Sequence, residues 1–83
     1  MHTVAIEKPA RKQLEKLPPQ IYESLIAAIA ALADTPRPSG CKKLTARNAY
    51  RIRVGDYRIV YAIDDGVPEV VVLAVGHRRQ IYE

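Results

Sequence analysis

The sequence has few of the residues that build large cores or covalent frameworks. Its 83 residues include no Trp and no Phe, so Leu, Ile, Val and five Tyr must fill the interior. The single cysteine, Cys41, excludes an internal disulfide and a cysteine-based metal cluster. We expect one domain over residues 1–83, with a core that supplies roughly a few kcal/mol of stability. A bound partner would therefore add a large share of that stability.

Long apolar runs and cofactor motifs are also missing. No run approaches the ~20 residues of a membrane-spanning helix, and the first residues do not resemble a signal peptide. Together with the lone cysteine, this favours a reducing cytoplasm. There is no Gly-rich phosphate loop, and His2 and His77 lack metal-ligand spacing with carboxylates. We therefore expect no metal and no cofactor, and chemistry that depends on Arg, His and Tyr.

Basic residues are concentrated in one part of the chain. The net charge of +4 is by itself weak evidence for nucleic acid. However, six of the eight basic residues in the second half lie between Lys42 and Arg58, where Asp56 is the only acid. Such local charge favours an anionic ligand. The basic side chains of this segment are Lys42, Lys43, Arg47, Arg51, Arg53 and Arg58.

Hydrophobic periodicity predicts an α+β fold in the order β-α-α-β-β-β. Apolar residues recur at helical spacing on both sides of Pro18 and Pro19, which predicts a helical hairpin. Three β-branched runs follow, and Gly55-Asp56 is a two-residue hairpin turn between the first two. The hairpin is expected to pack on one face of a small, mainly antiparallel sheet. The predicted strands are 3–6, 50–54, 57–63 and 70–75.

Strand alternation places three arginines on one face. A turn at Gly55-Asp56 pairs Arg53 with Arg58 and Arg51 with Val60. Like charges directly opposite each other are destabilising, so this pair is costly for folding alone. The plain alternative is a solvated basic face whose long stems cover apolar surface. The functional alternative is phosphate binding, for which the arginine fork is well suited.

The C-terminal tail strengthens the functional interpretation. His77, Arg78, Arg79 and Tyr82 directly follow the last predicted strand. Basic groups interleaved with an aromatic ring suit single-stranded RNA, because bases stack on rings while phosphates bind guanidinium groups. The alternatives are a surface histidine at His77 and a core-covering ring at Tyr82.

These motifs resemble the RelE/ParE toxin superfamily over nearly the whole chain. The similarity is carried by the Pro-broken helical hairpin, by YRIRVGDYRIVY at 50–61 and by GHRR at 76–79. We favour the RelE branch, which implies the RelE-like fold. It also implies the toxin of a type II toxin–antitoxin system, neutralised by a RelB-like antitoxin in a hetero-oligomer. RelE toxins are ribosome-dependent mRNA endonucleases, so the resemblance implies mRNA and the ribosome as partners.

The resemblance also implies roles for single residues. Arg51 and Arg53 match basic positions that contact the RNA, and Arg58 matches the arginine that stabilises charge on the scissile phosphate. Arg78 matches a residue that helps the leaving group, and Tyr82 matches an aromatic that stacks on the message. A ribose 2′-OH would attack the neighbouring phosphate, giving 2′,3′-cyclic phosphate and 5′-OH ends. We expect Lys42, Lys43, Arg47 and Arg79 to contact RNA.

The sequence offers alternatives for the proton carrier and for the function. Lysine often occupies the strand positions in this family, and an arginine stays protonated, so Arg53 is a poor general base. His77 is the better titrating candidate. The alternatives to a nuclease are a ParE-type inhibitor of DNA gyrase that cuts nothing, or an RNA-binding module without catalysis. The fold serves both toxin branches, so it does not decide between them.

Overall fold

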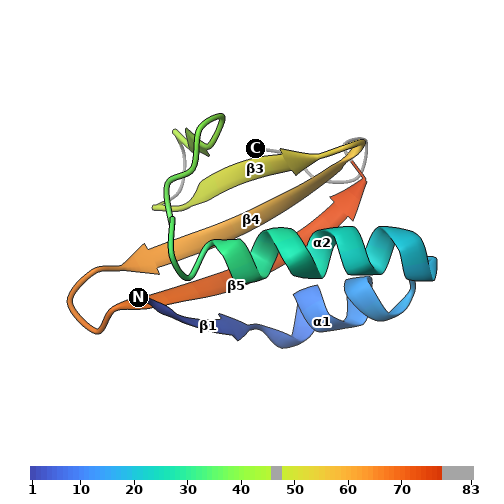
Figure 1. Cartoon of the computed structure of the whole chain (residues 1–83), viewed down its shortest axis with the longest axis horizontal. Coiled ribbons are helices and arrows are strands. Elements are labelled where there is room, and N and C mark those ends of the chain that lie inside the picture. Colours follow the sequence, from blue (N-terminus) through green and yellow to red (C-terminus); the bar gives the residue numbers. More distant parts are fainter. Residues whose placement is uncertain (46–47, 78–83) are drawn as a thin grey trace.

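The computed structural model, which describes residues 1–45 and 48–77, is a five-stranded sheet covered on one face by two helices (Figure 1). The sheet order is β1-β5-β4-β3-β2, with β1 parallel to β5 and the other neighbours antiparallel. The predicted fold class is confirmed. The elements are β1 (Thr3–Ile6), α1 (Lys8–Glu15), α2 (Pro19–Ala31), β2 (Lys42–Lys43), β3 (Tyr50–Val54), β4 (Tyr57–Asp64) and β5 (Glu69–His77).

Prolines mark the start of both helices. Pro9 lies in the first turn of α1, and Pro19 is the first residue of α2, positions where the missing N–H costs no hydrogen bond. Each helix buries a narrow apolar stripe against the sheet. The buried side chains are Ala10 and Leu14 from α1 and Leu25 and Ile29 from α2.

The main core lies between the helices and one face of the sheet. Ile52, Ile59 and Tyr61 from the central hairpin meet Val70, Val72 and Val75 from β5. The Tyr61 ring is fully buried, and its hydroxyl donates a 2.8 Å hydrogen bond to the carbonyl of Pro36. Burial raises the pKa of this phenol. The loop after α2 is thereby held against the end of the core.

The β3–β4 hairpin has the predicted register. Val54 pairs with Tyr57, Arg53 with Arg58 and Arg51 with Val60. Gly55 has φ +60°, whereas Asp56 does not have a positive φ, the combination found in a type II′ turn. This turn matches the right-handed twist of the strands, so it fixes which side chains face each other.

A β-bulge in β5 was not predicted. Tyr61 pairs with Val72 but Val60 pairs with Ala74, so Leu73 is an extra residue. Side chains alternate along a strand, and the extra residue reverses the alternation beyond it. Val72 and Val75 both pack in the main core, whereas Leu73 and Ala74 pack on the opposite face. The strand also continues to His77, two residues beyond its predicted end.

No helix of the described residues is long and apolar enough to cross a membrane.

Candidate functional site

The pair formed by Arg53 and Arg58 is the centre of the site. The two residues are direct partners on β3 and β4, one step from the Gly55-Asp56 turn. In a hairpin with a two-residue turn, the pair that flanks the turn is hydrogen-bonded and the next pair is not. Arg53 and Arg58 form that next pair, in which Cα atoms lie about 4.5 Å apart. Arg53 is exposed and Arg58 is half-buried. Two arginines therefore lie directly opposite each other on the same face of the sheet.

A small hollow of about 130 Å³ accompanies this pair, and we call it the arginine hollow. It is lined by Arg53, Gly55, Asp56, Tyr57 and Arg58. From the sequence, Asp56 is expected only as a turn residue. The structure adds a carboxylate to the lining that could accept a proton. The signal in the sequence was that Asp56 is the sole acid within the basic segment.

Arg51 has a different environment from the other two arginines. Its exposed fraction is only 5%, although it lies on the same sheet face. Its cross-strand neighbour Val60 belongs to a second apolar cluster, with Leu44 and Ala49. The prediction of one face for the three arginines is confirmed, but Arg51 is largely enclosed. It can act on a ligand mainly through its charge and by fixing the neighbouring side chains.

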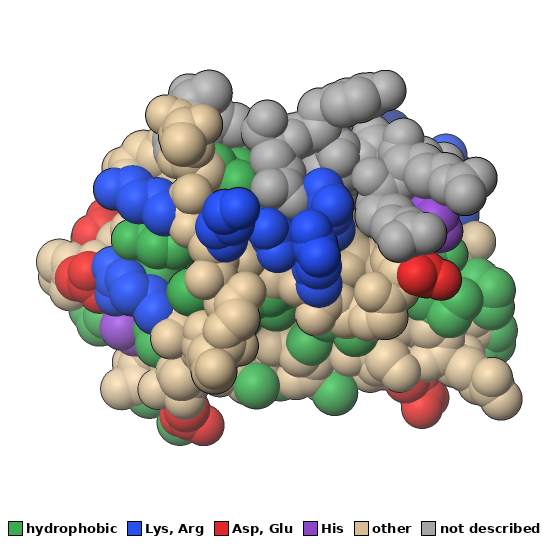
Figure 2. All heavy atoms as spheres, turned by 90° about the horizontal axis from the view of Figure 1, so that it is seen from above, with side chains coloured by type: hydrophobic (Ala, Val, Ile, Leu, Met, Phe, Trp, Pro, Cys, Tyr) green, Lys and Arg blue, Asp and Glu red, His purple; other side chains and the backbone are tan. Residues whose placement is uncertain are grey.

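Lysines extend the positive surface toward the edge of the sheet. Lys42 pairs with Arg51 and so shares its face, whereas Lys43 pairs with Tyr50 on the other face. Both lysines are exposed. Figure 2 shows Lys and Arg side chains gathered in the middle of this side of the molecule. An anion approaching β2 and β3 meets mainly positive charge.

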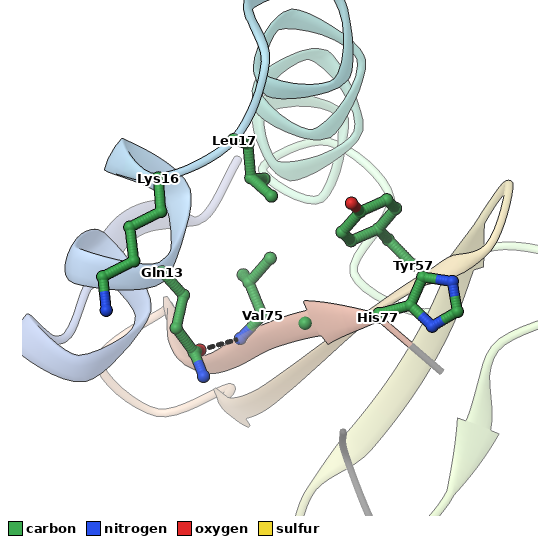
Figure 3. A pocket seen from close by; sticks show the side chains of 7 residues that line it. Gln13, Lys16, Leu17, Tyr57, Val75 and His77 are labelled. Atoms are coloured by element: carbon green, nitrogen blue, oxygen red, sulfur yellow. Dashed lines mark hydrogen bonds between the residues drawn. The ribbon is translucent and has the colours of Figure 1, made fainter. Parts of the chain in front are cut away.

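His77 is not brought together with the arginine pair. It is the cross-strand partner of Tyr57, so its side chain lies on the helix side of the sheet, opposite to that of Arg58. Its ring meets the Tyr57 ring edge-on, with centroids 5.5 Å apart. Figure 3 shows both rings at a hollow beside α1. The Leu73 bulge is the reason, because it reverses the alternation in this part of β5.

Four further predicted site residues lie outside the described residues. These are Arg47 from the basic segment and Arg78, Arg79 and Tyr82 from the tail. Their proposed contacts with RNA stay predictions. Within residues 1–45 and 48–77, no three His, Cys, Asp or Glu side chains are placed to hold a metal ion together.

A second polar network lies near the β4–β5 turn. Arg37 donates hydrogen bonds to Asp65 at 3.0 Å and to the Tyr50 hydroxyl at 3.3 Å, and its guanidinium lies 5.3 Å from the Tyr50 ring centroid. His2 is 3.2 Å from the other Asp65 oxygen. Arg37 and, less strongly, His2 lower the pKa of Asp65. The sequence alone does not reveal this network, because its members are far apart along the chain.

Comparison with known proteins gives consistent matches. The profile described as "ParE toxin of type II toxin-antitoxin system, parDE" matches residues 4–82. Toxin RelG of Mycobacterium tuberculosis is 39% identical over 84 residues, covering 98% of this chain and 95% of RelG. Toxin RelE of the same organism is 34% identical over 82 residues, covering 95% of this chain and 84% of that protein.

Solved structures agree with the sequence matches. The RelBE2 toxin–antitoxin complex of M. tuberculosis contains a chain with a TM-score of 0.83 and 35% identity, covering 93% of this chain and 98% of that one. The archaeal RelE–RelB complex of Pyrococcus horikoshii also gives a TM-score of 0.83, at 27% identity and coverage of 96% and 98%.

Proposed function

The chain belongs to the ParE toxin family of type II toxin–antitoxin systems and is a RelE-like toxin, and from this premise we propose that it is an endoribonuclease that cleaves mRNA in the ribosomal A site. The observation that carries the proposal is the Arg53–Arg58 pair. Two like charges placed directly opposite one another oppose folding, which is expected where the pair serves to bind an anion.

The proposed chemistry is a transfer within the RNA strand. A ribose 2′-oxygen attacks the adjacent phosphorus and the bond to the 5′-oxygen breaks, which leaves a 2′,3′-cyclic phosphate and a 5′-OH. Arg53 and Arg58 hold the phosphate and stabilise the charge that grows on it in the transition state. Asp56 is the described carboxylate in the arginine hollow, and we assign it to accept the 2′-OH proton.

The leaving 5′-oxygen takes up a proton from water, and Asp56 later returns the 2′-OH proton to the solvent, so the reaction is balanced. The resemblance assigns help at this step to Arg78, a tail residue outside the described part of the chain. Arg51 contributes fixed positive charge from its enclosed position beside Val60. Tyr82 is proposed to stack on a base of the message, and Lys42 to hold a flanking phosphate.

We further propose a RelB-like antitoxin as the physiological partner. Two solved relatives are complexes of RelE with RelB. An antitoxin segment with acidic side chains would neutralise Arg53, Arg58 and Lys42, which lie on this face beside the enclosed Arg51. Such binding would block RNA and also relieve the repulsion within the arginine pair.

A gyrase inhibitor is the second candidate function, because the matching profile carries the ParE name. The two functions make opposite predictions. Expression of the nuclease would create new 5′ ends on ribosome-bound mRNA, detectable by primer extension. Intact message together with DNA damage would support gyrase inhibition and exclude the nuclease. Intact message with normal growth would leave a binding module.

A further inference from the structure

A hollow of about 570 Å³ lies between α1 and the end of β5, on the helix side of the sheet (Figure 3). Its described lining includes Gln13, Lys16, Leu17, Tyr57, Val75 and His77, and we call it the α1–β5 hollow. We propose that it binds a nucleobase of the RNA whose phosphate is held by Arg53 and Arg58. This inference rests on the proposed function and adds a subsite to it.

The size and walls of the hollow fit a flat ring. Its volume lies within the range of small-molecule sites. Leu17 and Val75 give it apolar surface, and the Tyr57 hydroxyl points into it in Figure 3. The edge-on contact of Tyr57 and His77 forms an aromatic wall. Aromatic rings are the surfaces on which proteins stack single-stranded bases.

Two side chains of the hollow, Gln13 and Lys16, offer hydrogen-bond donors. Gln13 Oε1 accepts a 2.8 Å hydrogen bond from the backbone N–H of Val75, which orients the side-chain amide and leaves its NH₂ group as the donor. Lys16 adds an ammonium group. No acid is found among the described residues that line the hollow. The matching ligand therefore presents acceptors, and guanine offers two adjacent ones, O6 and N7.

The α1–β5 hollow and the arginine hollow share one lining residue, Tyr57. The Gly55-Asp56 turn, which directly precedes Tyr57 in the chain, lines the arginine hollow. A strand bound through one phosphate at Arg53 and Arg58 can therefore pass around the turn and place a neighbouring base beside His77. On this basis His77 is a substrate-binding residue rather than the proton carrier.

Titration with nucleotides tests the subsite without requiring cleavage. Labelled protein would be mixed with GMP, AMP or ribose 5-phosphate and followed by ¹H–¹⁵N NMR. We expect the Val75 backbone amide and the Gln13 side-chain amide to shift with GMP, less with AMP, and not with the base-free phosphate. Equal shifts from ribose 5-phosphate, or shifts confined to Arg53 and Arg58, would overturn the proposal.

Substitutions in the lining, with a matched control, separate recognition from folding. Gln13→Glu keeps an oxygen for the Val75 N–H but removes the NH₂ donor, so GMP affinity should fall by at least about fivefold. His77→Ala should lower the affinity for GMP by a similar factor. His77→Phe keeps an aromatic ring and should retain most of the affinity. Lys12→Ala, an exposed change on α1 outside the hollow, is the matched control for Lys16→Ala.

Cleavage kinetics distinguish this role from acid–base catalysis. His77→Ala should raise KM for ribosome-bound mRNA and change kcat little. Equal losses of kcat and kcat/KM in both His77 variants would show that the imidazole acts in the chemical step and would contradict the proposal. A protein that binds GMP at Val75 but cleaves no ribosome-bound mRNA would refute the nuclease and leave the subsite standing.

Discussion

Arg53 and Arg58 are direct cross-strand partners on β3 and β4, with like charges on the same face of the sheet. Replacing Arg58 with Ala should therefore lower RNA cleavage by roughly 10²–10³-fold through loss of transition-state stabilisation. The free energy of unfolding should change by less than about 1 kcal/mol, because the repulsion is relieved. Urea denaturation and single-turnover cleavage measure the two quantities. Unfolding of Arg58→Ala would instead make the residue structural.

Arg51 and Arg53 should differ in their effect on stability. The Arg51 side chain is 5% exposed and neighbours Val60, so Arg51→Ala removes buried packing and should cost about 1–3 kcal/mol. The exposed Arg53 provides the matched control, and Arg53→Ala should change the free energy of unfolding by about 0.5 kcal/mol or less. Equal urea midpoints for the two variants would contradict the difference in environment.

Salt dependence should report the phosphate contacts. For single-stranded RNA, the logarithm of the binding constant falls with the logarithm of salt concentration by about 0.7 per neutralised phosphate. Removing Lys42 or Arg53 should weaken the binding of all RNA sequences. Each removal should reduce this slope by the amount that corresponds to about one phosphate contact. Lys8→Ala, on the exposed start of α1, should leave the slope unchanged. A slope unaffected by Lys42→Ala would remove β2 from the RNA interface.

The Tyr61 hydroxyl should have a measurable stabilising role. Tyr61→Phe removes its 2.8 Å hydrogen bond to Pro36 and leaves a carbonyl without this donor, at a cost of about 1 kcal/mol. Tyr22 is 41% exposed, so Tyr22→Phe is the matched control and should change the melting temperature little. Equal melting temperatures for Tyr61→Phe and Tyr22→Phe would show that this hydrogen bond does not stabilise the fold.

Acid should weaken the network near the β4–β5 turn. The folded-state pKa of Asp65 is lowered from 3.8, first by Arg37 and then by His2. The stability from this shift is fully present above the unfolded-state pKa and is lost as pH falls through the folded value. The difference in melting temperature between wild type and Asp65→Asn should shrink below about pH 4. Asp34→Asn, at an exposed position after α2, should show no such convergence.

Local patterns were sufficient for most of the fold and for the arginine pair. Alternation and a two-residue turn determine the β3–β4 register, so Arg53 opposite Arg58 could be predicted from residues 50–61 alone. The two-residue strand β2 was not predicted, because its pairing with β3 depends on the tertiary fold. The same limit applies to Arg37 and Asp65, which only the folded chain brings within 3.0 Å.

His77 shows a different limit of sequence interpretation. Uninterrupted alternation from Val70 would place His77 on the side of the sheet opposite to Val70 and Val72. The extra residue at Leu73 changes this, and nothing in the run from Val70 to Val75 marks it, since all of its residues are apolar. The bulge lets β5 pack Val72 and Val75 in the main core and Leu73 and Ala74 on the opposite face. Its position therefore depends on the packing of the whole sheet.

The bulge also affects how relatives should be compared. A relative that gained or lost one residue between Val72 and Val75 would exchange the faces reached by the last part of β5. Two histidines in the same alignment column could then lie on opposite sides of the sheet and serve different purposes. Equivalence between toxins at this position therefore depends on the hydrogen-bond register of β5 with β4, and the GHRR letters alone do not establish it.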